Sequence, residues 1–199
     1  MSKISSILYS LIDAEDSCLI LIDAQKVFFD KLAEEEVEPL IKRMVWIVDV
    51  AVKLEIPVIV TAEYIEKNGS IIPELSEALP PEIKIHDKMI FGLGGDPEIL
   101  DALQKTKRNT TILLGLETDV CVAQSAIGLL ENGYKVVVLE DAVASPGKSH
   151  QYGLARMGSA GVLLSNVKSL FYEWVRTVGR SRKFYHTHKD ELRDPGIPL

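Results

Sequence analysis

A regular alternation of short apolar runs with longer stretches of helical period constrains this chain more than any other feature. Five continuous hydrophobic runs lie at 18–23, 56–62, 110–116, 135–142 and 160–165, and a weaker sixth lies at 83–87. Continuous runs of this kind are typical of strands that are buried on both faces of a parallel sheet. The segments between them carry apolar residues three and four apart, as helices do. The sequence therefore predicts the α/β class: a three-layer α/β/α sandwich with a six-stranded, mainly parallel, doubly wound sheet.

The length of the chain sets its domain organisation. A chain of 199 residues is long enough for one sizeable core and short for two domains. We expect a single domain over residues 1–199, with a core at about 17–178. The polar segment 179–199 is predicted to be an arm that is either loosely ordered or docked on a neighbouring subunit.

Composition and charge exclude several classes of function. The chain has a net charge of −7 and a pI near 5.2, which argues against a nucleic-acid partner because such binders carry a basic face. It has no apolar run of about 20 residues, so no membrane span is expected. The first residues lack the pattern of a secretion signal, which predicts a location in the cytoplasm or an organelle interior. Two cysteines, Cys18 and Cys121, are too few for a disulfide scaffold and are expected to be free thiols.

Three chemically reactive side chains stand where strands are predicted to end: Asp23, Lys88 and Cys121. In open parallel sheets, ligands bind outside the carboxyl ends of the strands. Each residue also has a purely structural interpretation, as a turn former, a solvated lysine or a small buried hydrophobe. We interpret Cys18 as a small buried hydrophobe. Cys121 differs, because the polar segment "ETD" precedes it at a strand-to-helix turn where backbone N–H groups and the helix dipole favour a thiolate.

The segments around these residues resemble the isochorismatase-like cysteine hydrolase superfamily over about residues 17–178. The resemblance rests on "LILIDAQKVFF" at the first strand, "KMIFGL" after the weak strand, and above all "GLETDVCVAQSAIGLLENGYKVVVLEDAVAS". It implies a catalytic triad of Asp23, Lys88 and Cys121. It also implies a cis peptide bond between Leu116 and Glu117.

The implied chemistry is hydrolysis by a cysteine nucleophile. Cys121 attacks a carbonyl, Lys88 stabilises the thiolate, and Asp23 accepts the thiol proton and returns it to the leaving group. The backbone N–H groups of Glu117 and Cys121 form the oxyanion hole. The resemblance thus predicts cleavage of an amide-like C–N bond of a small molecule through a thioester acyl-enzyme, with no cofactor.

The expected absence of a metal rests on the segment after the second strand. The nicotinamidase branch of the superfamily holds a metal there with an Asp and two His, whereas this chain has "TAEYIEKNGS". The chain holds four histidines in all, His86, His150, His186 and His188, and Glu63 offers only one carboxylate. We therefore expect a metal-independent enzyme and disfavour a nicotinamidase-type amidase.

Isochorismatases proper carry no cysteine at the nucleophile position, which argues against hydrolysis of a vinyl ether. The residues expected to line the substrate pocket are Gln25, Phe28, Phe29, Tyr64 and Phe91.

Two other functions compete with the hydrolase. The first is a catalytically vestigial binding or scaffold protein that acts through oligomerisation. All three triad residues are present, which weighs against it. The second is a thiol redox sensor, which needs a partner cysteine, and Cys18 is predicted at the opposite end of a strand from Asp23. For the hydrolase we expect a homo-oligomer.

Overall fold

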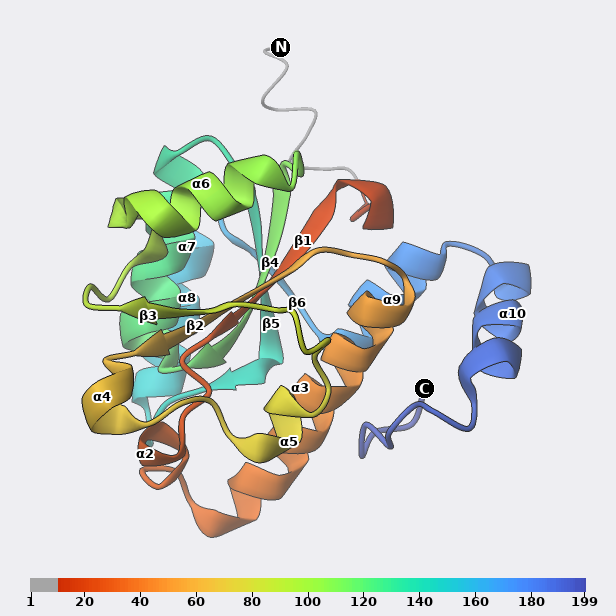
Figure 1. The fold of residues 1–199 in the computed structure, drawn as a ribbon, viewed down its shortest axis with the longest axis horizontal. Helices are drawn as coiled ribbons and strands as arrows, with labels where there is room; N and C mark the ends of the chain where they lie inside the picture. The colour runs from red at the N-terminus through yellow and green to blue at the C-terminus, as the bar shows by residue number, and fades with distance from the viewer. Residues whose placement is uncertain (1–10) are drawn as a thin grey trace.

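The computed structural model describes residues 11–199, and its six-stranded sheet confirms the predicted fold class (Figure 1). The strand order is β3-β2-β1-β4-β5-β6, and all five neighbouring pairs are parallel. The strands are β1 (Ser17–Ile22), β2 (Val58–Glu63), β3 (Ile85–Lys88), β4 (Thr110–Leu116), β5 (Lys135–Ala144) and β6 (Leu163–Ser165). The expectation that the chain starts without a secretion signal falls largely on residues outside those described.

Helices cover both faces of the sheet (Figure 1). One face packs against α3 (Glu34–Lys53) and α9 (Val167–Val175), and the other against α6 (Pro97–Lys105), α7 (Ala123–Glu131) and α8 (Ser149–Ser159). Three short helices, α2 (Lys26–Phe29), α4 (Ile65–Asn68) and α5 (Pro73–Ser76), lie in the loops after β1 and β2. Within residues 11–199, no helix is both long and apolar enough to cross a membrane.

The central strand β1 shows why the apolar runs are continuous. Leu19 and Leu21 belong to the core on the α3 side, whereas Ile20 and Ile22 belong to the core on the α7 side. All four are fully buried, and burying such a side chain stabilises the fold by roughly 1.5–3 kcal/mol. Strand β1 pairs with β2 on one side and β4 on the other. The strand order therefore reverses between β1 and β4, which is where doubly wound folds bind their ligands.

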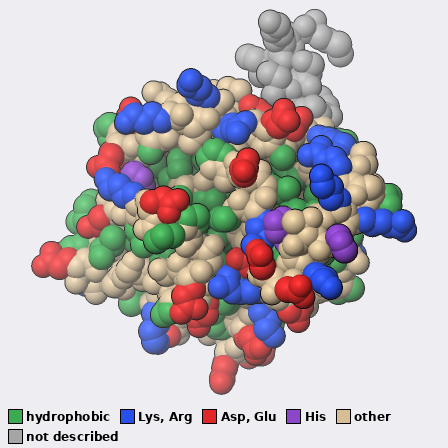
Figure 2. All heavy atoms as spheres, turned by 45° about the vertical axis from the view of Figure 1, so that its right-hand side comes forward, with side chains coloured by type: hydrophobic (Ala, Val, Ile, Leu, Met, Phe, Trp, Pro, Cys, Tyr) green, Lys and Arg blue, Asp and Glu red, His purple; other side chains and the backbone are tan. Residues whose placement is uncertain are grey.

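The C-terminal segment, predicted to be an arm, contains a helix. Residues 178–188 form helix α10 (Val178–His188), and Phe184 lies 5.4 Å from the Phe171 ring of α9. Beyond the helix, Arg193 forms a 2.8 Å ion pair with Asp49 of α3. Figure 2 turns this side of the molecule forward and shows acidic and basic side chains interspersed over it. The segment is thus fastened to its own subunit by a few apolar contacts and ion pairs within a mainly polar stretch.

Candidate active site

Asp23 lies directly after β1, in a left-handed backbone conformation with φ 48°. Its backbone N–H donates to the Thr61 carbonyl of β2 at 3.0 Å, and its Oδ1 accepts a 3.0 Å hydrogen bond from the Thr61 hydroxyl. The side chain is fully buried. The end of β2 therefore fixes the carboxylate at the point where β1 ends.

Lys88 is the last residue of β3, and its side chain is also fully buried. Its Nζ lies 2.6 Å from Asp23 Oδ2 and 3.6 Å from Cys121 Sγ. An ammonium group is rarely buried without a partner, because its desolvation costs several kcal/mol. Lys88 and Asp23 therefore form a buried ion pair next to the sulfur.

Cys121 lies in a π-helical turn, Thr118–Val122, which joins β4 to α7. Single π turns occur often at functional sites. Two glycines allow this turn to sit close to its neighbours. A Cβ on Gly115 would lie 1.9 Å from the Ile22 carbonyl oxygen, and one on Gly153 of α8 would lie 2.8 Å from the backbone of Asp119. Close backbone packing thus brings the sulfur to the end of β1.

The surroundings of the Cys121 thiol raise its pKa well above the usual range for cysteine. Burial is the largest cause, the negative charge of Asp23 comes next, and the Lys88 ammonium opposes both. Burial likewise raises the pKa of Asp23, although Lys88 acts in the opposite direction. The resting thiol is therefore protonated. This differs from the expectation of a favoured thiolate, because desolvation and the nearby carboxylates outweigh the ammonium.

The peptide bond between Leu116 and Glu117 is cis, as the resemblance implied. Among the described residues, no acceptor bonds the backbone N–H of Glu117, so this donor is available to a ligand oxygen. The Glu117 carboxylate forms an ion pair with Lys31, whose Nζ lies 3.1 Å away. The Lys31 ammonium also lies 4.7 Å from the centroid of the Phe28 ring.

The five residues predicted to line the substrate pocket do not form one wall. Gln25 is fully buried, and its side-chain amide bonds the backbone of Glu63. Phe29 lines a surface depression of about 680 Å³ against α3, and Phe91 lines another, of about 570 Å³, against α7. Neither depression includes Cys121. The aromatic residues after β1 and β3 are separated because β2 lies between these two strands in the sheet.

Tyr64 is 37% exposed and follows Glu63 directly. Its backbone N–H donates to the Lys88 carbonyl at 3.2 Å. Of the predicted pocket residues, Gln25 also bonds a site residue through the backbone, since its N–H donates to the Asp23 carbonyl at 2.8 Å.

Glu63 is the site residue that sequence reasoning undervalued. Its Oε2 lies 3.4 Å from Cys121 Sγ, which donates to it, and 3.8 Å from Lys88 Nζ. From the sequence alone, Glu63 offers only a single carboxylate that could bind a metal. The period of a strand offered a better signal, because residues two apart face the same side. Glu63 and Thr61 are two apart at the end of β2, and Thr61 bonds Asp23.

Oxygen and sulfur atoms of Asp23, Glu63 and Cys121 lie within 4.8 Å of one another, a spacing that a metal ion can bridge. The Lys88 ammonium, however, already contacts the oxygens of both carboxylates and the sulfur, at 2.6, 3.8 and 3.6 Å. A divalent cation at this position would meet a like charge at close range. The donor set therefore does not fit a metal.

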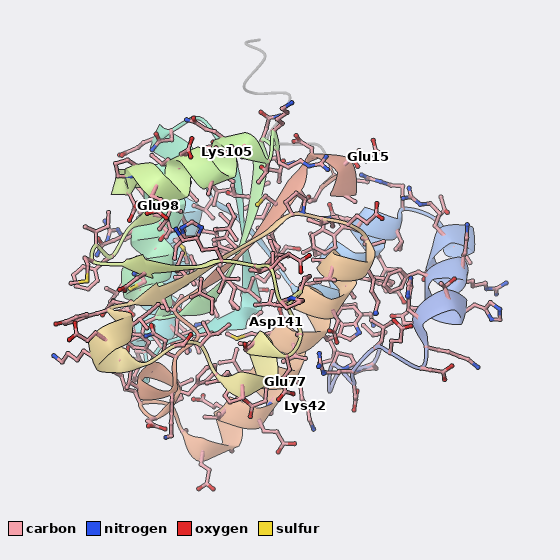
Figure 3. The ribbon with its side chains drawn as sticks, viewed as in Figure 1. Glu15, Lys42, Glu77, Glu98, Lys105 and Asp141 are labelled. Carbon is pink, nitrogen blue, oxygen red and sulfur yellow. The ribbon has the colours of Figure 1, made fainter. Side chains whose placement is uncertain are left out.

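The histidines are engaged elsewhere. His86 Nδ1 lies 3.2 Å from Glu98 of α6, which is labelled in Figure 3 at the edge of the molecule. His150 Nδ1 lies 3.0 Å from the Thr118 hydroxyl, and His186 and His188 belong to α10.

Comparison with known proteins identifies the family. A model of the Isochorismatase domain matches residues 17–169. The chain belongs to the isochorismatase family. The secreted isochorismatase effector Isc1 of Phytophthora sojae is 32% identical over 168 residues, which cover 82% of this chain and 79% of that protein.

Solved structures of the isochorismatase fold match over most of the chain. YcaC from Pseudomonas aeruginosa, with hexane-2,5-diol and covalent acrylamide, has a TM-score of 0.83 at 25% identity and covers 89% of each chain. The MAR1 ribonuclease from Caenorhabditis elegans has a TM-score of 0.81 at 29% identity and covers 96% of this chain and 98% of its own. The YcaC product of Escherichia coli, described as an octameric hydrolase of unknown specificity, has a TM-score of 0.81 at 22% identity and covers 92% and 93%.

Proposed function

We propose that this isochorismatase-family protein is a metal-independent cysteine hydrolase that cleaves an amide-like C–N bond of a small molecule. Asp23, Lys88 and Cys121 are the catalytic residues. The observation that carries the proposal is the fully buried Lys88, whose ammonium lies within 3.6 Å of both the Asp23 carboxylate and the Cys121 sulfur. Burial of a charge is costly unless it is paired, and this pair touches the one nucleophile of the site.

The first half of the reaction forms a thioester. Because the resting thiol is protonated, transfer of its proton to Asp23 accompanies attack of Sγ on the carbonyl carbon. The carbonyl oxygen becomes an oxyanion, which accepts hydrogen bonds from the backbone N–H groups of Glu117 and Cys121. The C–N bond then breaks, and the leaving nitrogen takes the proton from Asp23.

The second half releases the acid. Asp23, again a carboxylate, accepts a proton from a water molecule that attacks the thioester carbonyl. The C–S bond breaks, and the proton returns to Sγ, which restores the resting thiol. The Lys88 ammonium offsets the negative charge that develops on the sulfur in each half.

One structural neighbour holds a small molecule bound covalently. The Pseudomonas aeruginosa YcaC structure contains covalent acrylamide, a compound that carries an amide and reacts with thiolates. For this chain, the corresponding prediction is that small amides reach Cys121.

The metal-independent reaction rests on the Lys88 ammonium, which occupies the space between the three potential ligands. A nicotinamidase-type metal enzyme remains the alternative that chelation tests.

We further infer a small-molecule substrate, a homo-oligomer and a location in the cytoplasm or an organelle interior. The octameric Escherichia coli neighbour supports the oligomer. The similarity to MAR1 ribonuclease raises the question of an RNA substrate, against which stands the net charge of −7.

The experiment is a screen for ammonia release from small amides, ureides and carbamoyl compounds, with Cys121→Ser as the matched inactive variant. We expect turnover of at least one compound by the wild-type protein, together with a covalent acyl adduct on Cys121 after rapid acid quenching. A complete absence of turnover and adduct over the whole panel would favour the vestigial scaffold.

A further inference from the structure

The sulfur of Cys121 faces a second carboxylate, that of Glu63, which takes no part in the proposed mechanism. Glu63 Oε2 accepts from the Cys121 thiol at 3.4 Å and lies 3.8 Å from Lys88 Nζ. Its side chain is 21% exposed, whereas those of Asp23 and Lys88 are fully buried. Glu63 is therefore the charged group of this cluster that solvent, and hence an entering ligand, reaches.

The backbone of Glu63 is held in place by Gln25. The Gln25 Oε1 accepts from the Glu63 N–H at 2.7 Å, and the Gln25 Nε2 donates to the Glu63 carbonyl at 2.9 Å. The same Nε2 donates to the Gly69 carbonyl at 2.6 Å, which fastens the loop after β2. Because Gln25 is fully buried, the position of the carboxylate is set by the interior of the protein.

The charges around the sulfur do not balance. The carboxylates of Asp23 and Glu63 face a single ammonium, that of Lys88, and Lys88 lies 2.6 Å from Asp23 but 3.8 Å from Glu63. Among the described residues, no donor bonds the Oε1 of Glu63. One negative charge and one free acceptor atom are thus left at the exposed side of the site. A partly buried carboxylate favours a positive or hydrogen-bond-donating neighbour and disfavours a negative one.

We propose that Glu63 determines substrate specificity by charge, and that the substrate carries a cationic or N–H-rich group, such as an ammonium, amidinium or guanidinium, close to its scissile carbonyl. The inference rests on the proposed hydrolase function and names its substrate class. Glu63 binds this group through its free oxygen while Cys121 attacks the carbonyl. Small amides with a carboxylate or phosphate at the same place are rejected by repulsion.

Alkylation of Cys121 by small reagents of different charge tests this inference without knowledge of the substrate. Iodoacetamide is neutral, iodoacetate is an anion of nearly the same shape, and 2-bromoethylamine is a cation at neutral pH. Rates at Cys121 are followed by peptide mass spectrometry and divided by the rates with a free small thiol. Ratios between reagents are then compared, because any change in the pKa of the thiol affects all three reagents equally and cancels.

For the wild-type protein we expect the cation to be favoured over the anion relative to the free thiol. The Glu63→Gln variant keeps the shape and removes the charge, and it should lower this cation-to-anion ratio on the order of tenfold, as expected for a unit charge within a few ångström. Glu66→Gln is the matched control, since it removes the same charge from an exposed position of α4. It should leave the ratio unchanged.

An equal ratio in wild type and Glu63→Gln would overturn the specificity role while leaving the hydrolase proposal intact. An equal fall in Glu66→Gln would also overturn it, because net charge alone would then explain the preference. Failure of all three reagents to label Cys121 in any variant would contradict the proposed function itself, and this inference with it.

Discussion

The two cysteines of the molecule lie at opposite ends of the sheet, and their comparison shows how the surroundings of two buried thiols differ. Both are free, both are buried, and both belong to the core on the α7 side. Burial raises the pKa of each, that of Cys18 to about 12. The Cys18 Sγ contacts the Leu19 carbonyl at 3.8 Å, whereas Cys121 faces the charges of Lys88 and Glu63. Burial is therefore common to both thiols, and the two differ in the charged side chains that their sulfur atoms contact.

The topology of the sheet explains this difference. Cys18 is the second residue of β1, near the end where the parallel strands begin. Cys121 follows β4 at the other end, where the strand order reverses and polar side chains from β1, β2 and β3 converge. The same core cluster thus holds Cys18 at one end and a polar site around Cys121 at the other.

The largest expected effect is on turnover. Cys121→Ser should lower hydrolysis of any substrate found by roughly a thousandfold or more, because a serine hydroxyl is a much poorer nucleophile without a strong base. Cys18→Ser should keep the wild-type kcat per folded molecule. Its free energy of unfolding should fall by about 1–3 kcal/mol, because a hydroxyl is then placed in an apolar site. Ammonia release and urea denaturation measure the two effects. Hydrolysis near the wild-type rate in Cys121→Ser would remove the sulfur from the mechanism.

A large effect on stability is expected from the buried charge next to Cys121. Lys88→Met leaves the Asp23 carboxylate buried without its ammonium partner, so the free energy of unfolding at neutral pH should fall by roughly 3–5 kcal/mol. The exposed ion pair of Lys105 with Asp101 provides the control, since Lys105→Met should cost less than about 1 kcal/mol.

Adding Asp23→Asn to Lys88→Met should restore part of the lost stability, because the unpaired charge is then gone. Equal losses in the Lys88 and Lys105 variants, measured by urea denaturation, would show that Lys88 is not buried against Asp23.

The smallest expected effect is that of metal removal. Prolonged chelation followed by desalting should leave turnover within about twofold of the untreated protein, since the Lys88 ammonium fills the space that a metal would need. The control is the same treatment followed by addition of zinc, iron or manganese. A large loss that one of these ions restores would revive the metal-dependent amidase.

Much of this arrangement is visible in the sequence. Strand β4 has the bounds that the apolar run 110–116 predicts, because a strand buried on both faces leaves a continuous hydrophobic segment. Asp23, Lys88 and Cys121 were found from their places at strand ends, and the structure brings them together.

Three features were not predictable in the same way. Helix α10 has only Ser181 and Phe184 buried, so its polar sequence lacks the apolar period that predicts a helix. The period of β2 puts Glu63 on the same side as Thr61, but the nearness of Glu63 to the sulfur depends on the register of β2 against β1, which the sequence does not reveal. The raised pKa of Cys121 depends on the distances to two carboxylates, and those follow from tertiary packing alone.

The most direct test of the triad is the pH profile of iodoacetamide reaction at Cys121, measured with Cys18 replaced by Ala in every protein. In the parent protein the rate should keep rising above pH 8.5, the pKa of free cysteine, since burial and Asp23 raise the pKa of the thiol. Lys88→Met removes the cation that lowers this pKa, so its profile should shift to higher pH. Asp23→Asn removes an anion that raises it, so its profile should shift to lower pH while hydrolysis is lost. Three superimposed profiles would mean that neither charge lies near the sulfur, and they would contradict the triad.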